Sequence, residues 1–222
     1  MADALNLVFD LDGTLIDSAP QIHAAVNSVF AAKGLSGFSQ ETVRGFIGNG
    51  VEVLFDRLLA FKGLTHDADL QAELVGNFVR LYEEAFDLTA LYPGVSTAVS
   101  DLAAAGHHLA ICTNKPEGPT HAVLRHFGLE KFFTVVVGGD TLPRRKPDPA
   151  PLLSAISALG PRQTIFIGDS EVDAETARAA DVPLALFTRG YRRTAPEDLS
   201  AKLIFDDHAA LPRLIAHLAP RL

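Results

Sequence analysis

The sequence predicts an α/β fold, a doubly wound and mainly parallel sheet (a Rossmann-like core), with a helical insert after the first strand. Short apolar runs alternate with helix-like periodicity over most of the 222 residues, a pattern typical of such sheets. The rhythm breaks between 17 and 86, where only helical patterns occur. We therefore expect a core domain of 1–16 and 87–222 and a helical cap domain of 17–86.

The apolar runs predict the strands of the core. Most of them lack alternation of polar and apolar residues, as expected for strands that helices cover on both faces of a parallel sheet. The predicted strands are 5–9, 109–113, 134–138, 164–168 and 184–187, with 203–205 as a shorter candidate.

Helical periodicity fills the intervals between these runs, and most of the core helices end near a glycine or a proline. The predicted core helices are 95–105, 117–127, 149–159 and 172–180. Those of the insert are 20–32, 40–46, 51–61 and 68–85. A Tyr-Pro-Gly turn at 92–94 marks the return of the chain to the core.

Composition excludes several classes of partner. The formal net charge of -8 disfavours a nucleic-acid or anionic-membrane surface, since both need a basic face. No apolar run approaches the roughly 18 residues that span a bilayer, and the N-terminus lacks the pattern of a leader. The single cysteine, Cys112, lies in an apolar run and indicates a reducing compartment. We expect a cytoplasmic protein, with monomer and homodimer both open.

Polar side chains lie at or just beyond the ends of the predicted strands, at the edge where an α/β sheet binds its ligands. They are Asp10, Asp12, Thr113, Asn114, Asp169 and Asp173, with Lys146 in the loop after the third strand. Carboxylates this close would repel one another and raise each other's pKa. A divalent cation would remove that cost, and an all-oxygen set of ligands favours Mg²⁺.

This set of groups could transfer a phosphoryl group, since positioning and charge neutralisation supply most of that catalysis. One aspartate could act as the nucleophile, and a second could move the protons. Other interpretations remain: Asp12-Gly13 is also a hairpin signal, and Thr113-Asn114 and Asp169 could simply cap helices.

Four ordered motifs then point to a family. They are D-x-D-G-T at 10–14, T-N-K at 113–115, K-P at 146–147 and G-D-S-x-x-D at 168–173. With these motifs the chain resembles the haloacid dehalogenase superfamily of phosphotransferases over essentially its whole length. The resemblance implies a phosphatase whose helical insert is a mobile cap that closes over the site.

The same resemblance assigns the residues. Asp10 is expected to be the nucleophile and Asp12 the general acid and base. The phosphoryl group would be held by Thr113, Asn114 and Lys146. Mg²⁺ would bind the Asp10 carboxylate, the Asp12 backbone carbonyl and Asp169, with Asp173 supporting it from nearby.

Within the superfamily the chain is most similar to the bacterial phosphoglycolate phosphatases, through 17–20, 42–50, 113–116 and 138–140. This implies a small phosphorylated organic acid as the substrate. In the cap we expect the substrate to be bound by Arg44, Gly48, Asn49 and Gly50, which offer a charge and backbone N–H groups. The chain departs from the pattern at three places. Glu171-Val172 stands where Arg-Asn is common, Asp181 stands where a helix-ending glycine is common, and 189–192 only partly matches the expected Gly-Tyr stretch.

Alternatives stay open at this point. Within the same fold they are a phosphatase of another phosphoester, a pyrophosphatase, a sugar-phosphate mutase and a phosphonate hydrolase. The last would need an activated cap lysine, and the candidates are Lys33 and Lys62. A phosphorylation-operated receiver module also uses acidic residues, a threonine and a lysine, but it has no substrate cap and no second aspartate at position 12.

Overall fold

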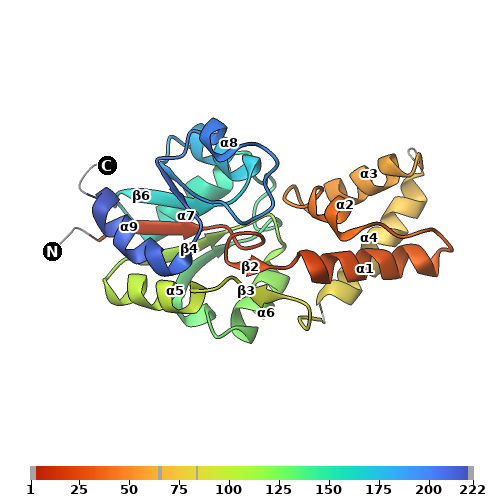
Figure 1. The fold of residues 1–222 in the computed structure, drawn as a ribbon, viewed down its shortest axis with the longest axis horizontal. Helices are drawn as coiled ribbons and strands as arrows, with labels where there is room; N and C mark the ends of the chain where they lie inside the picture. The colour runs from red at the N-terminus through yellow and green to blue at the C-terminus, as the bar shows by residue number, and fades with distance from the viewer. Residues whose placement is uncertain (1–3, 65–66, 84, 220–222) are drawn as a thin grey trace.

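The computed structural model describes residues 4–64, 67–83 and 85–219 and confirms the α/β prediction (Figure 1). Six strands form one sheet in the order β5-β4-β1-β6-β7-β8, and every neighbouring pair is parallel. Each predicted strand is present within one residue of its expected ends. The strands are β1 (Asn6–Phe9), β4 (His108–Cys112), β5 (Phe133–Val137), β6 (Thr164–Gly168), β7 (Leu184–Phe187) and β8 (Leu203–Phe205).

The hairpin interpretation of Asp12-Gly13 is wrong, because β1 pairs in parallel with β4 and β6 on its two sides. After the turn the chain forms β2 (Ile16–Asp17), which pairs antiparallel with β3 (Ala90–Leu91). These two-residue strands carry no periodicity that a sequence pattern could reveal. They lie where the chain leaves the core for the insert and where it returns.

Helices cover both faces of the sheet, as a doubly wound fold requires. One face carries α5 (Val95–Ala104), α6 (Glu117–His126) and α9 (Leu211–Leu218), which share a core with Leu7 and Phe9. The other carries α7 (Ala150–Leu159) and α8 (Glu171–Ala179), packed around Val8. Helix α9 was not predicted. The short 3₁₀ helices are η1 (Glu130–Phe132), η2 (Pro196–Leu199) and η3 (His208–Ala210).

The helices of the insert lie to one side of the sheet (Figure 1), and its described residues form four of them. They are α1 (Ala19–Ala32), α2 (Gln40–Arg44), α3 (Val51–Phe61) and α4 (Ala68–Glu83). Their apolar faces enclose a core of their own, with Phe30, Phe55 and Phe78 fully buried at its centre. In the described part of the chain, no helix has the length and apolar character needed to cross a bilayer.

Asp181, one of the departures from the family pattern, adopts a positive φ of 54° just after α8. This is the left-handed backbone region that a glycine at the end of a helix would occupy. Aspartate enters it more readily than most residues because its short polar side chain can bond locally. The replacement therefore keeps the local backbone of the pattern.

His208 is a buried histidine in an aromatic cluster beside β7 and β8. Its ring centroid lies 4.3 Å from that of Phe187 and 5.3 Å from that of Phe205, and its side chain is 1% exposed. Neither ring nitrogen has a hydrogen-bond partner among the described residues. Burial lowers the pKa of His208 from 6.5 to about 4, so the folded protein holds this ring neutral.

His208 is expected to make stability depend on pH. Between about pH 4 and 6.5, His208 is protonated in the unfolded chain but neutral in the folded chain. The free energy of unfolding therefore falls as the pH falls through this window. For one such histidine the loss between pH 7.5 and 4.5 is roughly 2 to 3 kcal/mol. Urea unfolding of the wild type and His208→Leu at both pH values measures it. The difference between the two proteins should change by that amount, whereas exposed His217→Gln should track the wild type; a difference independent of pH contradicts the expectation.

Candidate active site

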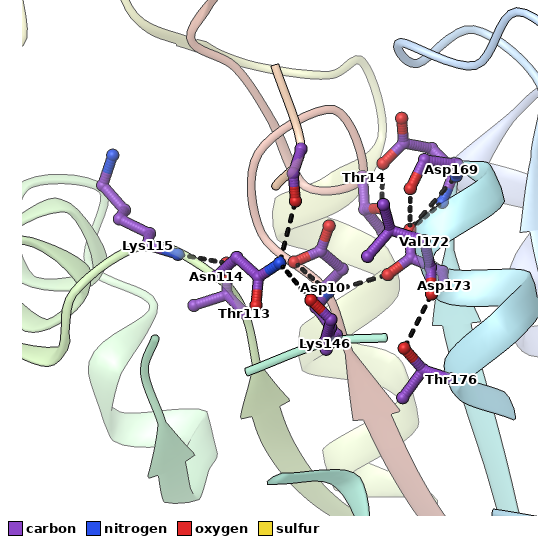
Figure 2. Close-up of polar contacts among 12 residues, drawn as sticks. Asp10, Thr14, Thr113, Asn114, Lys115, Lys146, Asp169, Val172, Asp173 and Thr176 are labelled. Atoms are coloured by element: carbon purple, nitrogen blue, oxygen red, sulfur yellow. Dashed lines mark hydrogen bonds and ion pairs between the residues drawn. The ribbon is translucent and has the colours of Figure 1, made fainter. Parts of the chain in front are cut away.

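The loops that follow three neighbouring strands meet at one edge of the sheet, as predicted (Figure 2). Asp10 follows β1 at the centre, Thr113 follows β4 on one side, and Asp169 follows β6 on the other. Lys146, from the loop before α7, lies against the same edge. All four side chains are buried, so they act on one another through little water.

Lys146 is held between two carboxylates. Its Nζ lies 2.9 Å from Asp10 Oδ1 and 2.7 Å from Asp173 Oδ1, and its side chain is 2% exposed. Burial by itself would lower the pKa of Lys146, but the charges of Asp10 and Asp173 outweigh that effect and raise it. The ammonium group therefore stays charged at neutral pH.

The acidic residues of the site are more crowded than one lysine can neutralise. Asp10, Asp169 and Asp173 each offer an oxygen, and these atoms all lie within 4.8 Å of one another. Burial, partly offset by Lys146, raises the pKa of Asp10 to about 7. Burial and the nearby Asp173 and Asp10 charges raise the pKa of Asp169 well above its ordinary value. A divalent cation would favour the ionised form of both groups.

The hydrogen bonds divide the three carboxylates into two roles. Asp173 Oδ2 accepts from the backbone N–H of Asp169 and of Ser170 (3.1 Å each) and from Ser170 Oγ (2.7 Å), while its Oδ1 meets Lys146. Asp169 accepts one bond on each oxygen, from Thr14 Oγ1 (2.9 Å) and from a backbone N–H (2.6 Å). Asp169 and Asp10 keep oxygen lone pairs for a cation, whereas Asp173 is occupied in holding the loop.

Gly13 explains the glycine of the first motif. Its φ is 86°, and a Cβ there would lie 2.5 Å from Asp169 Oδ2. Any side chain would therefore be strained in the turn and would push the Asp169 carboxylate out of the site. The absence of a side chain at this turn lets the loop after β1 approach the loop after β6.

Asn114 ties the insert to the core. Its Nδ2 donates to the backbone carbonyl oxygens of Lys146 and of Gly48, both at 2.9 Å (Figure 2). Thr113 Oγ1 accepts from the backbone N–H of Lys115 at 3.3 Å. Both N–H groups of the Asn114 amide are thus engaged with protein, and a direct bond from Asn114 to a phosphoryl group stays a prediction.

Arg44, expected in the substrate site, binds the core instead. Its Nη2 donates to the backbone carbonyl oxygens of Gly190 (2.7 Å) and Arg189 (3.1 Å), and its guanidinium carbon lies 5.4 Å from the centroid of the Tyr191 ring. In this arrangement Arg44 joins α2 to the loop after β7. It does not line the cavity described below.

Only part of the Gly-Asn-Gly turn at 48–50 lies at the cavity. Gly48 and Gly50 line the cavity, and their φ values of 119° and 89° suit glycine. The Asn49 side chain turns away from the cavity, because its Oδ1 accepts from Arg57 Nη2 at 2.8 Å. The structure therefore brings two of the four predicted cap residues to the cavity.

The cavity lies between the strand ends and the insert and is small, about 70 Å³. The core supplies its polar floor, which includes Asp10, Asp12, Thr113, Asn114 and Lys115. The insert supplies a mostly apolar roof, formed by Ile22, Ile47, Val51, Leu54, Phe78 and Val79 with the phenol ring of Tyr82. A ligand in this space would place its charged end on the core and its remainder under apolar side chains.

Two residues of the cavity had no assigned role in the sequence. Lys115 Nζ lies 2.5 Å from the hydroxyl of Tyr82 and 3.5 Å from Asp12 Oδ1, which also accepts from Ser18 Oγ at 2.6 Å. Burial alone would lower the pKa of Lys115, but Asp12 and Tyr82 outweigh it and raise the pKa. The T-N-K motif was a visible signal for Lys115. Tyr82 had none, since it is one of several large residues in a helical pattern.

Tyr191 links the acidic cluster to the start of the insert. Its backbone N–H donates to Asp169 Oδ2. Its hydroxyl accepts from the backbone N–H groups of Ser18 (2.8 Å) and Ala19 (3.0 Å) and donates to Asp17 Oδ1 (3.0 Å). Because Tyr191 lies 172 to 174 positions from Ser18, Ala19 and Asp17, no local pattern could have placed its hydroxyl there.

Glu171, another departure from the family pattern, binds a neighbouring loop. Its Oε1 accepts from the backbone N–H groups of Arg193 (2.7 Å) and Thr194 (2.6 Å). Although burial opposes it, these bonds lower the pKa of Glu171. The extra carboxylate therefore fixes the loop that carries Tyr191.

Comparisons with known proteins agree with this geometry. The family model described as haloacid dehalogenase-like hydrolase matches residues 7–187. A phosphoglycolate phosphatase of Cereibacter sphaeroides is 48% identical over 213 residues, which cover 96% of this chain and 98% of the relative. One of Rhodobacter capsulatus is 41% identical over 94% of this chain and 95% of its own. The crystal structure of a predicted phosphoglycolate phosphatase from Haemophilus somnus 129PT superposes on this chain with a TM-score of 0.87. The two sequences are 32% identical, and the match covers 95% of this chain and 97% of the other.

Proposed function

The chain belongs to the haloacid dehalogenase-like hydrolase family and is a phosphoric monoester hydrolase, and we propose that its substrate is 2-phosphoglycolate, which it hydrolyses to glycolate and phosphate. The observation that carries the choice of substrate is the small cavity with a charged floor and an apolar roof. The names of the relatives from Cereibacter and Rhodobacter support the same substrate.

In the reaction we propose, an Asp10 carboxylate oxygen attacks phosphorus and the bond to the ester oxygen breaks. The departing glycolate oxygen takes a proton from the Asp12 carboxyl group, which leaves an aspartyl-phosphate on Asp10. The Asp12 carboxylate then removes a proton from a water molecule, whose oxygen attacks phosphorus and frees Asp10. Lys146, 2.9 Å from Asp10 Oδ1, would balance negative charge on the transferring group, with Thr113 and Asn114 beside it.

The residues present fit a divalent cation, and we propose Mg²⁺. Asp10, Asp169 and Asp173 bring buried carboxylate oxygens within 4.8 Å of one another, and an all-oxygen donor set suits that ion. We propose the carboxylates of Asp10 and Asp169 as ligands, with the backbone carbonyl of Asp12 added by the family resemblance. Bound there, Mg²⁺ would neutralise charge on the phosphoryl oxygens. Asp173 would support the site by holding the backbone of Asp169 and the ammonium of Lys146.

The roof of the cavity argues against the same-fold alternatives. Sugar hydroxyls need hydrogen-bond partners when they are buried, and the described lining of the insert offers the Tyr82 hydroxyl and the backbone near Gly48 and Gly50. The lysine that a phosphonate hydrolase would need is missing from this lining, since Lys33 pairs with Glu73 and Lys62 Nζ bonds Ser36 Oγ (2.6 Å). A receiver module is disfavoured by the covered cavity itself.

A panel of phosphoesters tests the substrate. With purified protein and Mg²⁺, kcat/KM for 2-phosphoglycolate should exceed that for glucose 6-phosphate, ribose 5-phosphate and glycerol 3-phosphate by roughly 100-fold or more, because those substrates bury unpaired hydroxyl groups. The same assay on Asp10→Asn, purified in parallel, measures the activity of any contaminating phosphatase. A sugar phosphate ranking above 2-phosphoglycolate would refute the substrate but leave the phosphatase. Release of one phosphate per protein, without turnover, would instead favour the receiver module.

A further inference from the structure

We propose that Lys115 binds the carboxylate of the substrate, and that Tyr82 of the insert holds the Lys115 ammonium in position for it. The proposal rests on the proposed phosphatase function and specifies the chemistry at the far end of the same cavity. It makes Lys115 the residue that selects phosphoesters of small carboxylic acids over neutral phosphoesters.

Lys115 is the cation that the described lining of the cavity offers. Its side chain is buried, and the roof above it consists mostly of aliphatic and aromatic groups. A carboxylate enclosed under such a roof is costly unless it meets an opposite charge and a hydrogen-bond donor. A buried ammonium group supplies both.

The other nearby cations are already engaged. Arg44 binds the carbonyl oxygens at 189 and 190, Arg57 binds Asn49 and the Phe46 carbonyl, Arg145 pairs with Glu52 at 2.7 Å, and Lys146 lies between Asp10 and Asp173. Of these residues, Arg44 was the one expected to meet the substrate carboxylate. With Arg44 engaged on the core, we assign that role to Lys115, in the core loop after β4.

Lys115 keeps donor capacity toward the cavity. An ammonium group has three N–H donors, and the Tyr82 hydroxyl accepts one of them at 2.5 Å. The nearest Asp12 oxygen is 3.5 Å away, which is an ion-pair distance and longer than a good hydrogen bond. The Tyr82 contact comes from α4, so the ammonium is oriented by the insert that roofs the cavity.

The position of Lys115 also matches the size of the substrate. Asp12 is the proposed proton donor to the ester oxygen, and in 2-phosphoglycolate one methylene carbon separates that oxygen from the carboxylate. The group that binds the carboxylate must therefore lie close to Asp12, and Lys115 is its direct neighbour. A longer phosphorylated acid would place its carboxylate beyond this point.

Lys115→Met tests the proposal because it keeps the length of the side chain and removes the charge. The quantity measured is the ratio of kcat/KM for 2-phosphoglycolate to kcat/KM for ethyl phosphate, which has the same ester but no carboxylate. This ratio should fall roughly 30- to 100-fold, the value of one charge-assisted contact. Lys131→Met, an exposed lysine on η1, is the matched control and should keep the wild-type ratio. Tyr82→Phe should lower the ratio by a smaller factor, roughly 3- to 10-fold.

The rival role for Lys115 is to position Asp12, and the ratio separates the two. If Lys115 acts only through Asp12, both substrates lose activity equally and the ratio stays within about threefold, which overturns the proposal. Calorimetry measures the binding of 3-phosphonopropanoate, which carries a carboxylate, and of propylphosphonate, which does not. These two affinities distinguish failure of the carboxylate subsite from failure of the proposed function. Preference for the carboxylate ligand that depends on Lys115, without hydrolysis of 2-phosphoglycolate, would refute the function and keep the subsite. Hydrolysis with a preference that survives Lys115→Met would refute the subsite alone.

Discussion

Asp10→Asn is expected to lower kcat for phosphate release by roughly 10⁴-fold or more, because an amide cannot serve as the nucleophile that carries the phosphoryl group. The fold should persist. Asn fills nearly the same volume, and Lys146 keeps its contact with Asp173 at 2.7 Å. Steady-state phosphate release with 2-phosphoglycolate measures the loss, and urea unfolding of the same preparation shows that the variant is folded.

Asp101→Asn is the matched control, since Asp101 is exposed on α5 and should keep wild-type kcat. Acid quenching during turnover gives a second, independent result. The wild type should yield a denatured protein carrying an acyl-phosphate that hydroxylamine removes, and Asp10→Asn should yield none. Near-normal kcat in the folded variant, or equal trapping of phosphate in both proteins, would show that another residue is the nucleophile.

The sheet and the polar ends of its strands could be predicted because both are encoded locally. A buried parallel strand is a short apolar run, and the residue after it must lie at the ligand-binding edge. Asp10, Thr113 and Asp169 follow their strands directly, so the strand positions alone place them together. Lys146 lies well beyond the end of β5, so the strand positions do not place it. It was assigned through its motif.

The contacts between the insert and the core could not be predicted in this way. Arg44 offered a charge beside a glycine-rich turn, which fits a substrate site, but its partners are carbonyl oxygens about 145 positions later in the chain. The Tyr191 hydroxyl finds Ser18 and Ala19 over a similar separation. Such contacts depend on how two separately packed units meet, and periodicity within either unit carries no information about that.

Removal of divalent cations is expected to lower turnover by roughly 10³-fold, and added Mg²⁺ should restore it, because three buried carboxylates then share the single positive charge of Lys146. Binding of Mg²⁺ should also stabilise the folded state against thermal unfolding. At a Mg²⁺ concentration about 100 times its Kd, the folded state gains about 2.7 kcal/mol, which for a protein of this size raises Tm by roughly 5 to 10 °C. Thermal unfolding with EDTA and with Mg²⁺ measures this shift without any substrate.

Asp169→Asn separates a metal ligand from an ordinary buried hydrogen-bonding group. Burial and the charges of Asp173 and Asp10 raise the pKa of Asp169 well above normal, so at neutral pH the ionised group is held at a cost when no cation is bound. Without metal the variant should therefore be at least as stable as the wild type, although a buried group that merely accepted bonds from Thr14 and Tyr191 would lose stability. With Mg²⁺ the Tm of the variant should stay unchanged while the wild type and Asp101→Asn both rise. A variant that keeps the Mg²⁺-dependent rise in Tm would show that the cation binds elsewhere, and the proposed role of Asp169 would be wrong.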